Sequence, residues 1–287
     1  MGMIWELDFY SRPILDENQK KRWELLICDS DQTFQFAKNC SGAEANARWL
    51  ETALNEAKEQ WQKQYDLTDN TRPEKVRFFR RAMNSIIVRG CEAAGLAAIP
   101  SRRTFALTRW LQERVEQVYP YEPGYDPALA NPPTLPPPAP EPLPPALRGE
   151  QWQLTAIPWS ELNSARDWGL PFGDIPSLAL FDLEPDTPIP GLIIYSQRAL
   201  PLAGWLSGIE PAFIDSISTP LNQLILETGA SDRWILATLR QSDLIKEAKA
   251  FMEGIKDSQN LHFLAVQPSP TVEELSGFWL LCLDEFM

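Results

Sequence analysis

Apolar and polar residues alternate at the start of the chain. In WELDF, residues 5–9, large apolar side chains alternate with Glu6 and Asp8, and this period of two predicts a half-buried β-strand. Trp-Glu-Leu returns eighteen residues later, so we expect a second strand at 22–28, and TFQFAKN at 33–39 predicts a third. The first two strands should form a hairpin that places its large apolar side chains on a core face.

The pattern then changes to a helical period. Ser41 and Glu44 in SGAE predict a capping box, and apolar residues recur at three- and four-residue spacing from Leu50 to Trp61. The later elements are a strand at 75–79, a helix at 81–94, a strand at 96–100 and a helix from Leu107 to Val118. As an alternative to the strand at 75–79, Thr71, Pro73 and Glu74 could begin a helix there. This β-β-β-α-β-α-β-α order predicts a mixed sheet faced by helices. It is also the order of the ribonuclease H-like fold.

The second half of the chain has the same mixed character. Six apolar segments predict strands, at 177–183, 191–196, 222–228, 233–239, 261–266 and 277–283. ETGASDR between two of them has the composition of a hairpin turn, and the apolar spacing after Ser242 predicts an amphipathic helix over 243–257. We therefore expect a second α/β domain.

A proline-rich segment separates the two halves. Twelve of the 26 prolines fall between Pro120 and Pro145, and proline lacks the amide donor that a helix or an inner strand needs. A semi-rigid linker in the polyproline II conformation is therefore expected. The predicted organisation is an N-terminal α/β domain at 1–119, a linker at 120–148 and an acidic C-terminal α/β domain at 149–287.

Charge is distributed unevenly along the chain. The formal net charge is −13, which argues against non-specific binding to nucleic acids. Residues 149–287 hold 7 Lys and Arg against 19 Asp and Glu, whereas residues 72–109 hold nine basic residues and two acidic ones. Any site for a polyanion should therefore lie in the basic segment 72–109.

No motif in the sequence predicts an enzyme or a cofactor. The 14 glycines form neither a phosphate-binding loop nor a dinucleotide fingerprint, and the four cysteines have no metal-ligand spacing. The one histidine, His262, lies in an apolar segment and is expected to be a core or edge residue. We therefore expect no catalytic residues, no metal and no cofactor.

The basic segment combines arginines with aromatic residues. VRFFRR at 76–81 interleaves both kinds, and SRRT at 101–104 places two guanidiniums and backbone amides at the expected start of a helix. Guanidinium forks suit phosphates, and exposed aromatic rings stack on unpaired bases. The candidate RNA-binding residues are Arg77, Phe78, Phe79, Arg80, Arg81, Arg89, Arg102, Arg103 and Arg109. The structural alternative is that the phenylalanines are core residues and that the arginines solubilise helix faces or pair with acids of the same domain.

Several long stretches carry a resemblance to a known family. They are IWELDFYSRPILDENQKKRWELLICD, VRFFRRAMNSIIVRGCEAAGLAAIPSRRTFALTRWLQERVEQVYPYEPGY, YSQRALPLAGWLSGIEP, RWILATL and GFWLLCLD. In these stretches the chain resembles the cyanobacterial and chloroplast family of RNA-binding translation factors for photosystem I. The algal member of that family activates translation of the messenger for one of the photosystem I reaction-centre proteins. The resemblance covers both expected domains.

The resemblance implies binding to A/U-rich 5′ untranslated regions of messenger RNA and a role in translating subunits of photosystem I, and in plants also of photosystem II. Trp279, Leu280 and Leu281 match the family's C-terminal Trp-Leu-Leu motif, which by its apolar character belongs to a buried strand. Further partners would be proteins of the translation machinery or of photosystem assembly.

The location is also an expectation from the resemblance. Plastid members begin with a transit peptide, and the N-terminus here shows no such pattern. No apolar run is long enough to span a bilayer. A cytoplasmic location in a cyanobacterium is therefore expected, or the chloroplast stroma for a processed plastid member.

Three functions of different classes are open at this point. The leading hypothesis is single-strand capture of a messenger leader, with arginines on phosphates and aromatic rings on bases. The second is a protein-interaction or assembly factor for photosystem biogenesis without direct RNA contact, which the acidic C-terminal half favours. The third is a metal-dependent nuclease built on Asp8 with Glu44 or Glu51. Arg80 and Arg81 disfavour it, because they would repel a metal ion at the end of the fourth strand.

Overall fold

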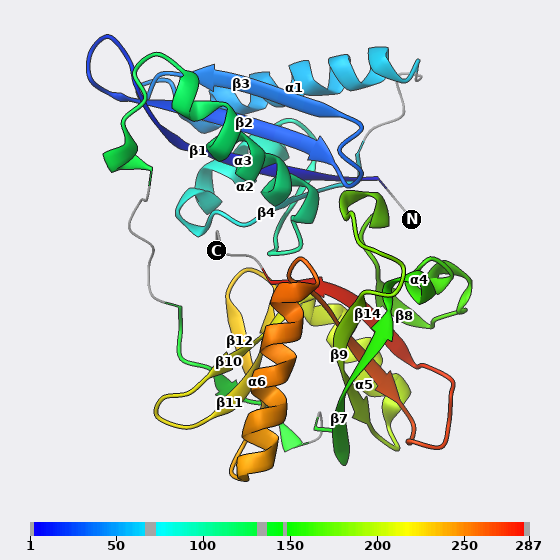
Figure 1. Ribbon diagram of the computed structural model, residues 1–287. Helices are drawn as coiled ribbons and strands as arrows, with labels where there is room; N and C mark the ends of the chain where they lie inside the picture. Colours follow the sequence, from blue (N-terminus) through cyan, green and yellow to red (C-terminus); the bar gives the residue numbers. More distant parts are fainter. Residues whose placement is uncertain (1–2, 67–72, 131–136, 146–147, 284–287) are drawn as a thin grey trace. The chain divides into compact units, whose positions relative to one another are not determined.

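The chain folds into two compact α/β units. A computed structural model describes residues 3–66, 73–130, 137–145 and 148–283, and the units divide the chain as Met1–Pro136 and Pro137–Met287 (Figure 1). Sheets and helices in each unit enclose a hydrophobic core of its own, so the predicted class of mixed sheets flanked by helices is confirmed. None of the helices in the described part of the chain combines the length and the apolar character that crossing a membrane requires.

The first unit contains a five-stranded sheet. Its strands are β1 (Ile4–Leu15), β2 (Lys21–Asp29), β3 (Gln35–Cys40), β4 (Lys75–Phe78) and β5 (Ala97–Pro100). The order is β3-β2-β1-β4-β5, in which β1, β2 and β3 pair antiparallel while β4 and β5 run parallel to β1. The expected hairpin forms. Trp5 lies opposite Asp29 and Trp23 lies opposite Ser11, so the two Trp-Glu-Leu copies are at opposite ends of the hairpin.

Helices cover both faces of this sheet. They are α1 (Ala47–Gln64), α2 (Asn84–Ala93), which follows the 3₁₀ turn η1 (Arg81–Met83), and α3 (Phe105–Gln117). α1 and α2 bury the face that carries Trp5, Leu7 and Phe9. α3 packs against β1 and β2 on the opposite face. Since side chains alternate along a strand, Glu6 and Asp8 of β1 point toward α3.

The first helix begins later than the sequence predicted. Ser41 Oγ does donate to the Glu44 carboxylate at 2.8 Å, but this pair closes a turn that precedes the helix. Asn46 caps α1 instead, because its Oδ1 accepts from the backbone N–H groups of Arg48 and Trp49, each at 3.0 Å. These are amides that a helix leaves unpaired. The predicted cap was therefore assigned to the wrong residue.

The proline-rich segment contributes structure to both units. Its first part forms the 3₁₀ turns η2 (Tyr119–Tyr121) and η3 (Pro127–Leu129), and the backbone N–H of Leu15 donates to the carbonyl oxygen of Gly124 at 2.8 Å. Its later part contains β6 (Glu141–Pro142), which pairs with a strand of the second unit. Residues 131–136 lie outside the described residues. Hydrogen bonds thus join residues beyond 120 to β1.

The second unit contains two sheets. The first is formed by β7 (Gln151–Pro158), β8 (Phe172–Asp174), β9 (Pro188–Tyr195), β13 (Leu261–Gln267) and β14 (Gly277–Cys282), in the order β7-β9-β13-β14-β8. The second joins β6 to β10 (Pro211–Ile217), β11 (Gln223–Thr228) and β12 (Asp232–Thr238), in the order β10-β11-β12-β6. The helical segments are α4 (Trp159–Leu162), η5 (Ala165–Asp167), η6 (Leu178–Leu180), α5 (Ala199–Ile209) and α6 (Ser242–Asp257). The predicted hairpin turn at ETGASDR joins β11 to β12 and is confirmed.

One predicted element of this unit is wrong, and several were missed. Residues 177–183 were expected to form a strand, but they contain the 3₁₀ turn η6, in which Leu180 is buried. A short apolar run does not by itself distinguish a strand from a buried turn. β7 was missed because two glutamines and a threonine interrupt its apolar residues, and β10 because it begins with a proline. α5 was missed because it contains Pro201 and two glycines, and α4 and β8 because they span only 4 and 3 residues.

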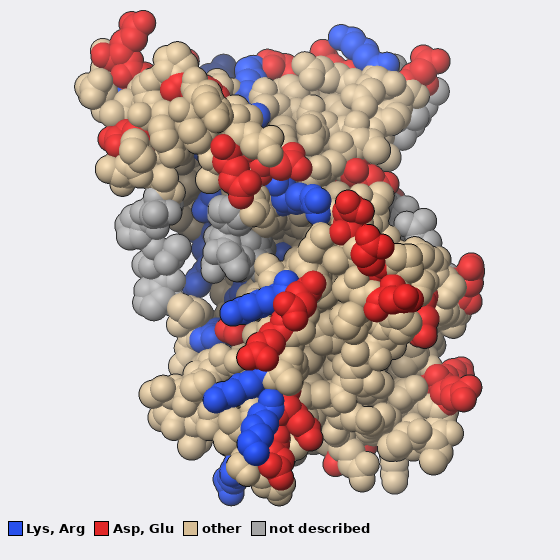
Figure 2. Space-filling model, viewed as in Figure 1, with Lys and Arg blue, Asp and Glu red and all other residues tan. Residues whose placement is uncertain are grey.

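The first sheet of the second unit is buried on both faces. α5 and α6 cover one face, with a core that includes Leu264 and Trp279. The segment around α4 covers the other, with Phe263 and Phe278 in its core. On the outside of the lower half of α6, basic side chains gather toward one flank of the helix and acidic side chains toward the other (Figure 2).

His262 joins the two sheets of the second unit as a neutral group, and its predicted core position is confirmed. Its Nε2 accepts from the backbone N–H of Ile214 in β10 at 2.7 Å. Nδ1 therefore carries the proton, and it faces the carbonyl oxygen of Asn260 at 3.2 Å. Burial lowers the pKa of His262 to about 3.

Replacing Gly90 of α2 by alanine should destabilise the first unit. A Cβ at this position would lie 2.8 Å from Cδ2 and 3.0 Å from Cβ of Leu50, where α1 meets α2. Overpacking usually costs about 1–3 kcal/mol, which exceeds the helix propensity of about 1 kcal/mol that alanine gains over glycine. Gly208→Ala in α5 is the control, since a Cβ there would meet nothing within 4 Å. Urea denaturation should show a loss for Gly90→Ala only, and equal stabilities would contradict the close contact.

The second unit should lose stability as the pH falls below about 6.5, the ordinary pKa of histidine. The unfolded chain then binds a proton that the folded unit does not bind until about pH 3. The free energy of unfolding should therefore fall by about 1.4 kcal/mol per pH unit from this cause. His262→Gln has no titrating group at this position. The difference in free energy of unfolding between the parent protein and this variant, measured by urea denaturation, should therefore become smaller between pH 7 and pH 5. The carboxylates titrate alike in both proteins and do not affect this difference. A difference in free energy of unfolding that stays constant with pH would rule out a neutral His262 in the folded unit.

Candidate nucleic-acid interface

Three carboxylates lie on the face of the first sheet that α3 covers. Glu6 and Asp8 are two residues apart in β1, and Glu24 lies in β2, opposite Tyr10. All three are almost fully buried, with at most 3% of each residue exposed. A buried carboxylate is costly unless it is paired, so each needs a partner from a neighbouring element.

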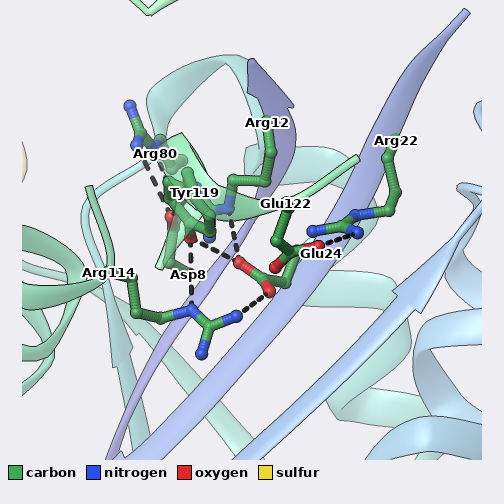
Figure 3. A network of polar contacts seen from close by, with 8 residues as sticks. All are labelled: Asp8, Arg12, Arg22, Glu24, Arg80, Arg114, Tyr119 and Glu122. Atoms are coloured by element: carbon green, nitrogen blue, oxygen red, sulfur yellow. Dashed lines mark hydrogen bonds and ion pairs between the residues drawn. The ribbon is translucent and has the colours of Figure 1, made fainter. Parts of the chain in front are cut away.

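Arg12 and Arg80 are the partners of Asp8. Arg12 Nη1 lies 2.9 Å from Asp8 Oδ2, and Arg80 Nε donates to Asp8 Oδ1 at 2.9 Å (Figure 3). Burial by itself would raise the pKa of Asp8, but the two guanidiniums outweigh it and hold the pKa below its ordinary value. Asp8 is therefore an anion in the folded unit, and its bond to Arg80 connects the residue after β4 to β1.

Glu24 accepts from three donors. Arg12 Nε donates to its Oε2 at 2.8 Å, Arg114 Nη2 donates to its Oε1 at 2.5 Å, and the Tyr119 hydroxyl donates to Oε2 (Figure 3). Burial, together with the charge of Glu24, raises the pKa of Tyr119 above its ordinary value, so the phenol keeps its proton. Arg114 belongs to the last turn of α3 and Tyr119 follows the helix. The network therefore fastens the C-terminal end of α3 to the sheet.

Glu6 holds the other end of α3. Its Oε2 accepts from the backbone N–H of Leu107, in the first turn of the helix, at 2.8 Å. Helix N-termini favour anions, and here the anion is a side chain of the same unit. This amide lies three residues beyond SRRT, and its bond to Glu6 makes a carboxylate of the same unit the anion in the first turn of α3.

The aromatic residues of VRFFRR face inward. Phe78 is 1% exposed and belongs to the core beneath α1 and α2, and Phe79 is 7% exposed. The Arg80 guanidinium lies over two rings, with Cζ 4.4 Å from the centre of the Tyr10 ring and 4.6 Å from that of Phe79. These positions support the structural alternative for the two phenylalanines, since they pack β4 and support a guanidinium.

The other predicted arginines differ in exposure. Arg81 in η1 and Arg89 in α2 are exposed, and within the described ranges neither has an ion-pair partner. The remaining four are half-buried or buried: Arg77 and Arg109 are half-buried, and Arg102 and Arg103 are 7% and 1% exposed. The structure therefore leaves Arg81 and Arg89 as the predicted arginines that are both exposed and unpaired in this part of the chain.

The Trp-Leu-Leu motif lies in β14, between β13 and β8. Trp279 and Leu281 pack on the side of α5 and α6, and Leu280 packs in the core on the opposite face. Each of the three is at most 1% exposed. These positions support the interpretation that the motif is structural.

The carboxylates of the nuclease hypothesis lie apart. Asp8 faces α3, whereas Glu51 belongs to α1, which covers the opposite face of the sheet. Glu44 accepts from Ser41 in the turn before α1. Among the described residues, no three His, Cys, Asp or Glu side chains are placed to hold a metal ion. Arg80, which was expected to repel a metal, is one of the two arginines that pair with Asp8.

Sequence reasoning missed most of this network, although part of its signal was present. Glu6 and Glu24 are the central residues of the two Trp-Glu-Leu copies. The period of two that predicts the first strand also predicts that Glu6 and Asp8 share a face. Nothing in the pattern indicates that Arg80 and Arg114 reach that face, because they follow it by many residues and belong to other elements.

Two protein-family models match the chain. The model described as RNA-binding protein Tab2/Atab2 N terminal matches residues 4–114, and the one described as RNA-binding protein Tab2/Atab2, C-terminal domain, matches residues 130–282. A protein of Arabidopsis thaliana named "Protein TAB2 homolog, chloroplastic" is 37% identical over 286 residues, which cover 96% of this chain and 74% of that protein. The Zea mays protein of the same name is 36% identical over 283 residues, which cover 96% of this chain and 70% of its own. No solved structure matches the chain, so the ribonuclease H-like arrangement stays a prediction.

Removing the charge of Glu24 should strongly destabilise the first unit. In Glu24→Gln, Arg12 and Arg114 remain at the same buried place without their shared anion, and breaking a buried pair in this way usually costs about 3–5 kcal/mol. Urea denaturation followed by circular dichroism measures the loss. Glu59→Gln, an exposed change in α1, is the control and should stay within about 0.5 kcal/mol of the parent protein. Equal stability of both variants would show that the network does not hold α3.

Proposed function

Because the chain belongs to the family of RNA-binding proteins described as Tab2/Atab2, we propose that it binds the 5′ untranslated region of messenger RNA and promotes translation of photosystem I subunits. The family models match 4–114 and 130–282, which confirms the predicted resemblance and carries the proposal. The name "chloroplastic" of both relatives supports a target in photosynthesis. The family is described as RNA-binding, and the proposal contains no catalytic step.

The proposed RNA is a single-stranded, A/U-rich leader. Sequence-selective proteins generally read RNA where bases are unpaired, because the A-form major groove is too narrow for side chains. A leader held in single-stranded form is open to the ribosome, which gives binding a direct effect on translation. The proposed place of action is the cytoplasm of a cyanobacterium or the stroma of a chloroplast.

We place the first phosphate contacts on Arg81 and Arg89. Both guanidiniums are exposed on consecutive elements, η1 and α2, about two helical turns apart. Arg80 lies just before them and is held by Asp8. Because Asp8 offsets the charge of Arg80, Arg80 is not counted among these contacts. Phe78 and Phe79 act in this proposal by packing β4, on which these residues depend.

Reversing both exposed charges should weaken RNA binding. We expect Arg81→Glu/Arg89→Glu to bind a single-stranded A/U-rich RNA about tenfold or more weakly in filter binding at low salt, because two phosphates lose their cations. The slope of log affinity against log salt should become shallower by about 1.4, since each phosphate on single-stranded RNA contributes about 0.7.

The control keeps the change in net charge similar. Lys20→Glu/Lys63→Glu alters two exposed lysines of the same unit, one in the β1–β2 connection and one at the end of α1. It should retain most of the affinity. If both double variants bind like the parent protein while remaining folded, the surface around η1 and α2 is not the RNA contact. If both double variants lose RNA affinity equally, the net charge of the protein determines binding and not the surface around η1 and α2.

A further inference from the structure

β7 is an edge strand with unusual composition for its position. It forms one margin of the first sheet of the second unit and pairs with β9. Its eight residues, QWQLTAIP, include no charged side chain, and its one proline is at the end. Edge strands normally carry lysine, proline or a bulge that prevents pairing with another chain.

A groove of about 590 Å³ lies beside β7. It is lined by Glu150 and the first residues of β7 on one side, and by Leu244 and Glu247 of α6 on the other. Its apolar part consists of Trp152, Leu154 and Leu244, all of which are half-buried. The groove therefore combines apolar surface with the free margin of a sheet.

The charged groups of the groove are acidic. Glu150 and Glu247 are the charged residues that line it, and both are exposed. Glu150 is held in place because its Oε2 accepts from the backbone N–H of Gln197 at 3.1 Å. Figure 2 agrees, since acidic side chains lie along the flank of α6 on which β7 is drawn in Figure 1. Carboxylates at both walls disfavour a phosphate backbone and favour a cationic occupant.

We propose that this groove binds an extended basic segment of a partner protein, which adds to β7 as a further strand. Strand addition gives affinity through backbone hydrogen bonds and specificity through alternate side chains. Apolar side chains of the segment would pack on Leu154 and Leu244. Its Lys or Arg residues would pair with Glu150 and Glu247 or stack on the Trp152 ring. This inference is independent of RNA binding.

The test uses the full chain and a fluorescein-labelled nine-residue peptide of alternating arginine and valine, without RNA. Fluorescence anisotropy should show saturable binding, and the matching glutamate–valine peptide should not bind. Methylating the peptide's backbone nitrogens along one edge should remove most of the affinity, because that edge can no longer donate to β7. Equal binding of the methylated and unmethylated peptides would overturn strand addition.

Two charge reversals on α6 locate the site. Glu247→Lys should weaken binding about tenfold. Glu253→Lys makes the same change in net charge on an exposed residue about 120° away around the helix, and it should change affinity less than about twofold. Equal losses of peptide affinity in the two variants would show that binding depends only on the net charge of the protein, and would overturn the proposal. Filter binding of A/U-rich RNA by Glu247→Lys should remain at the parent level, so failure of one proposal does not depend on the other.

Discussion

The first unit depends on two buried glutamates that hold α3 against the sheet. Glu6 bonds to the first turn of the helix, and Glu24 bonds to Arg114 in its last turn and to Tyr119 beyond it. The same hairpin presents its apolar side chains to α1 and α2 on the opposite face. Buried ion pairs add little net stability compared with apolar packing, but the loss of one partner is severe. Through these bonds the two glutamates contact α3 at both of its ends.

This network takes up one cation of the basic segment, Arg80, together with two arginines from outside that segment. Arg12, Arg80 and Arg114 surround Asp8 and Glu24, so three guanidiniums offset two carboxylates inside the unit. Counted along the sequence, residues 72–109 form a strongly cationic stretch. In the folded unit, part of that charge has an internal structural function, and a smaller outward-facing part supports the proposed contact with RNA. An acidic protein can bind a polyanion when a few unpaired cations lie on one surface, since screening limits the range of the remaining charge to about 10 Å.

In the second unit, the sheet that contains β14 is buried on both faces. Trp279 and Leu281 on one side and Leu280 on the other show why three consecutive apolar residues occur in β14. One edge of the sheet is β7, whose residues are half-buried or exposed, and Glu150 and Glu247 of the neighbouring groove give this edge its charge. The acidic groove beside β7 is the basis of the proposed binding of a basic segment by this unit.

The sequence by itself determined the class of fold, most strands of both units and the family. These follow from the period of two, the helical spacing and long matching stretches, which are local properties of the chain. It also placed Glu6 and Asp8 on one face. Tertiary structure decided the rest: that Asn46 rather than Ser41 caps α1, that residues 177–183 turn instead of forming a strand, and that Phe78 and Phe79 are core residues. It likewise decided that Arg80 is paired while Arg81 is exposed. The physical reason is that pairing and burial depend on which distant element packs against a residue, and a one-dimensional pattern carries no record of that neighbour.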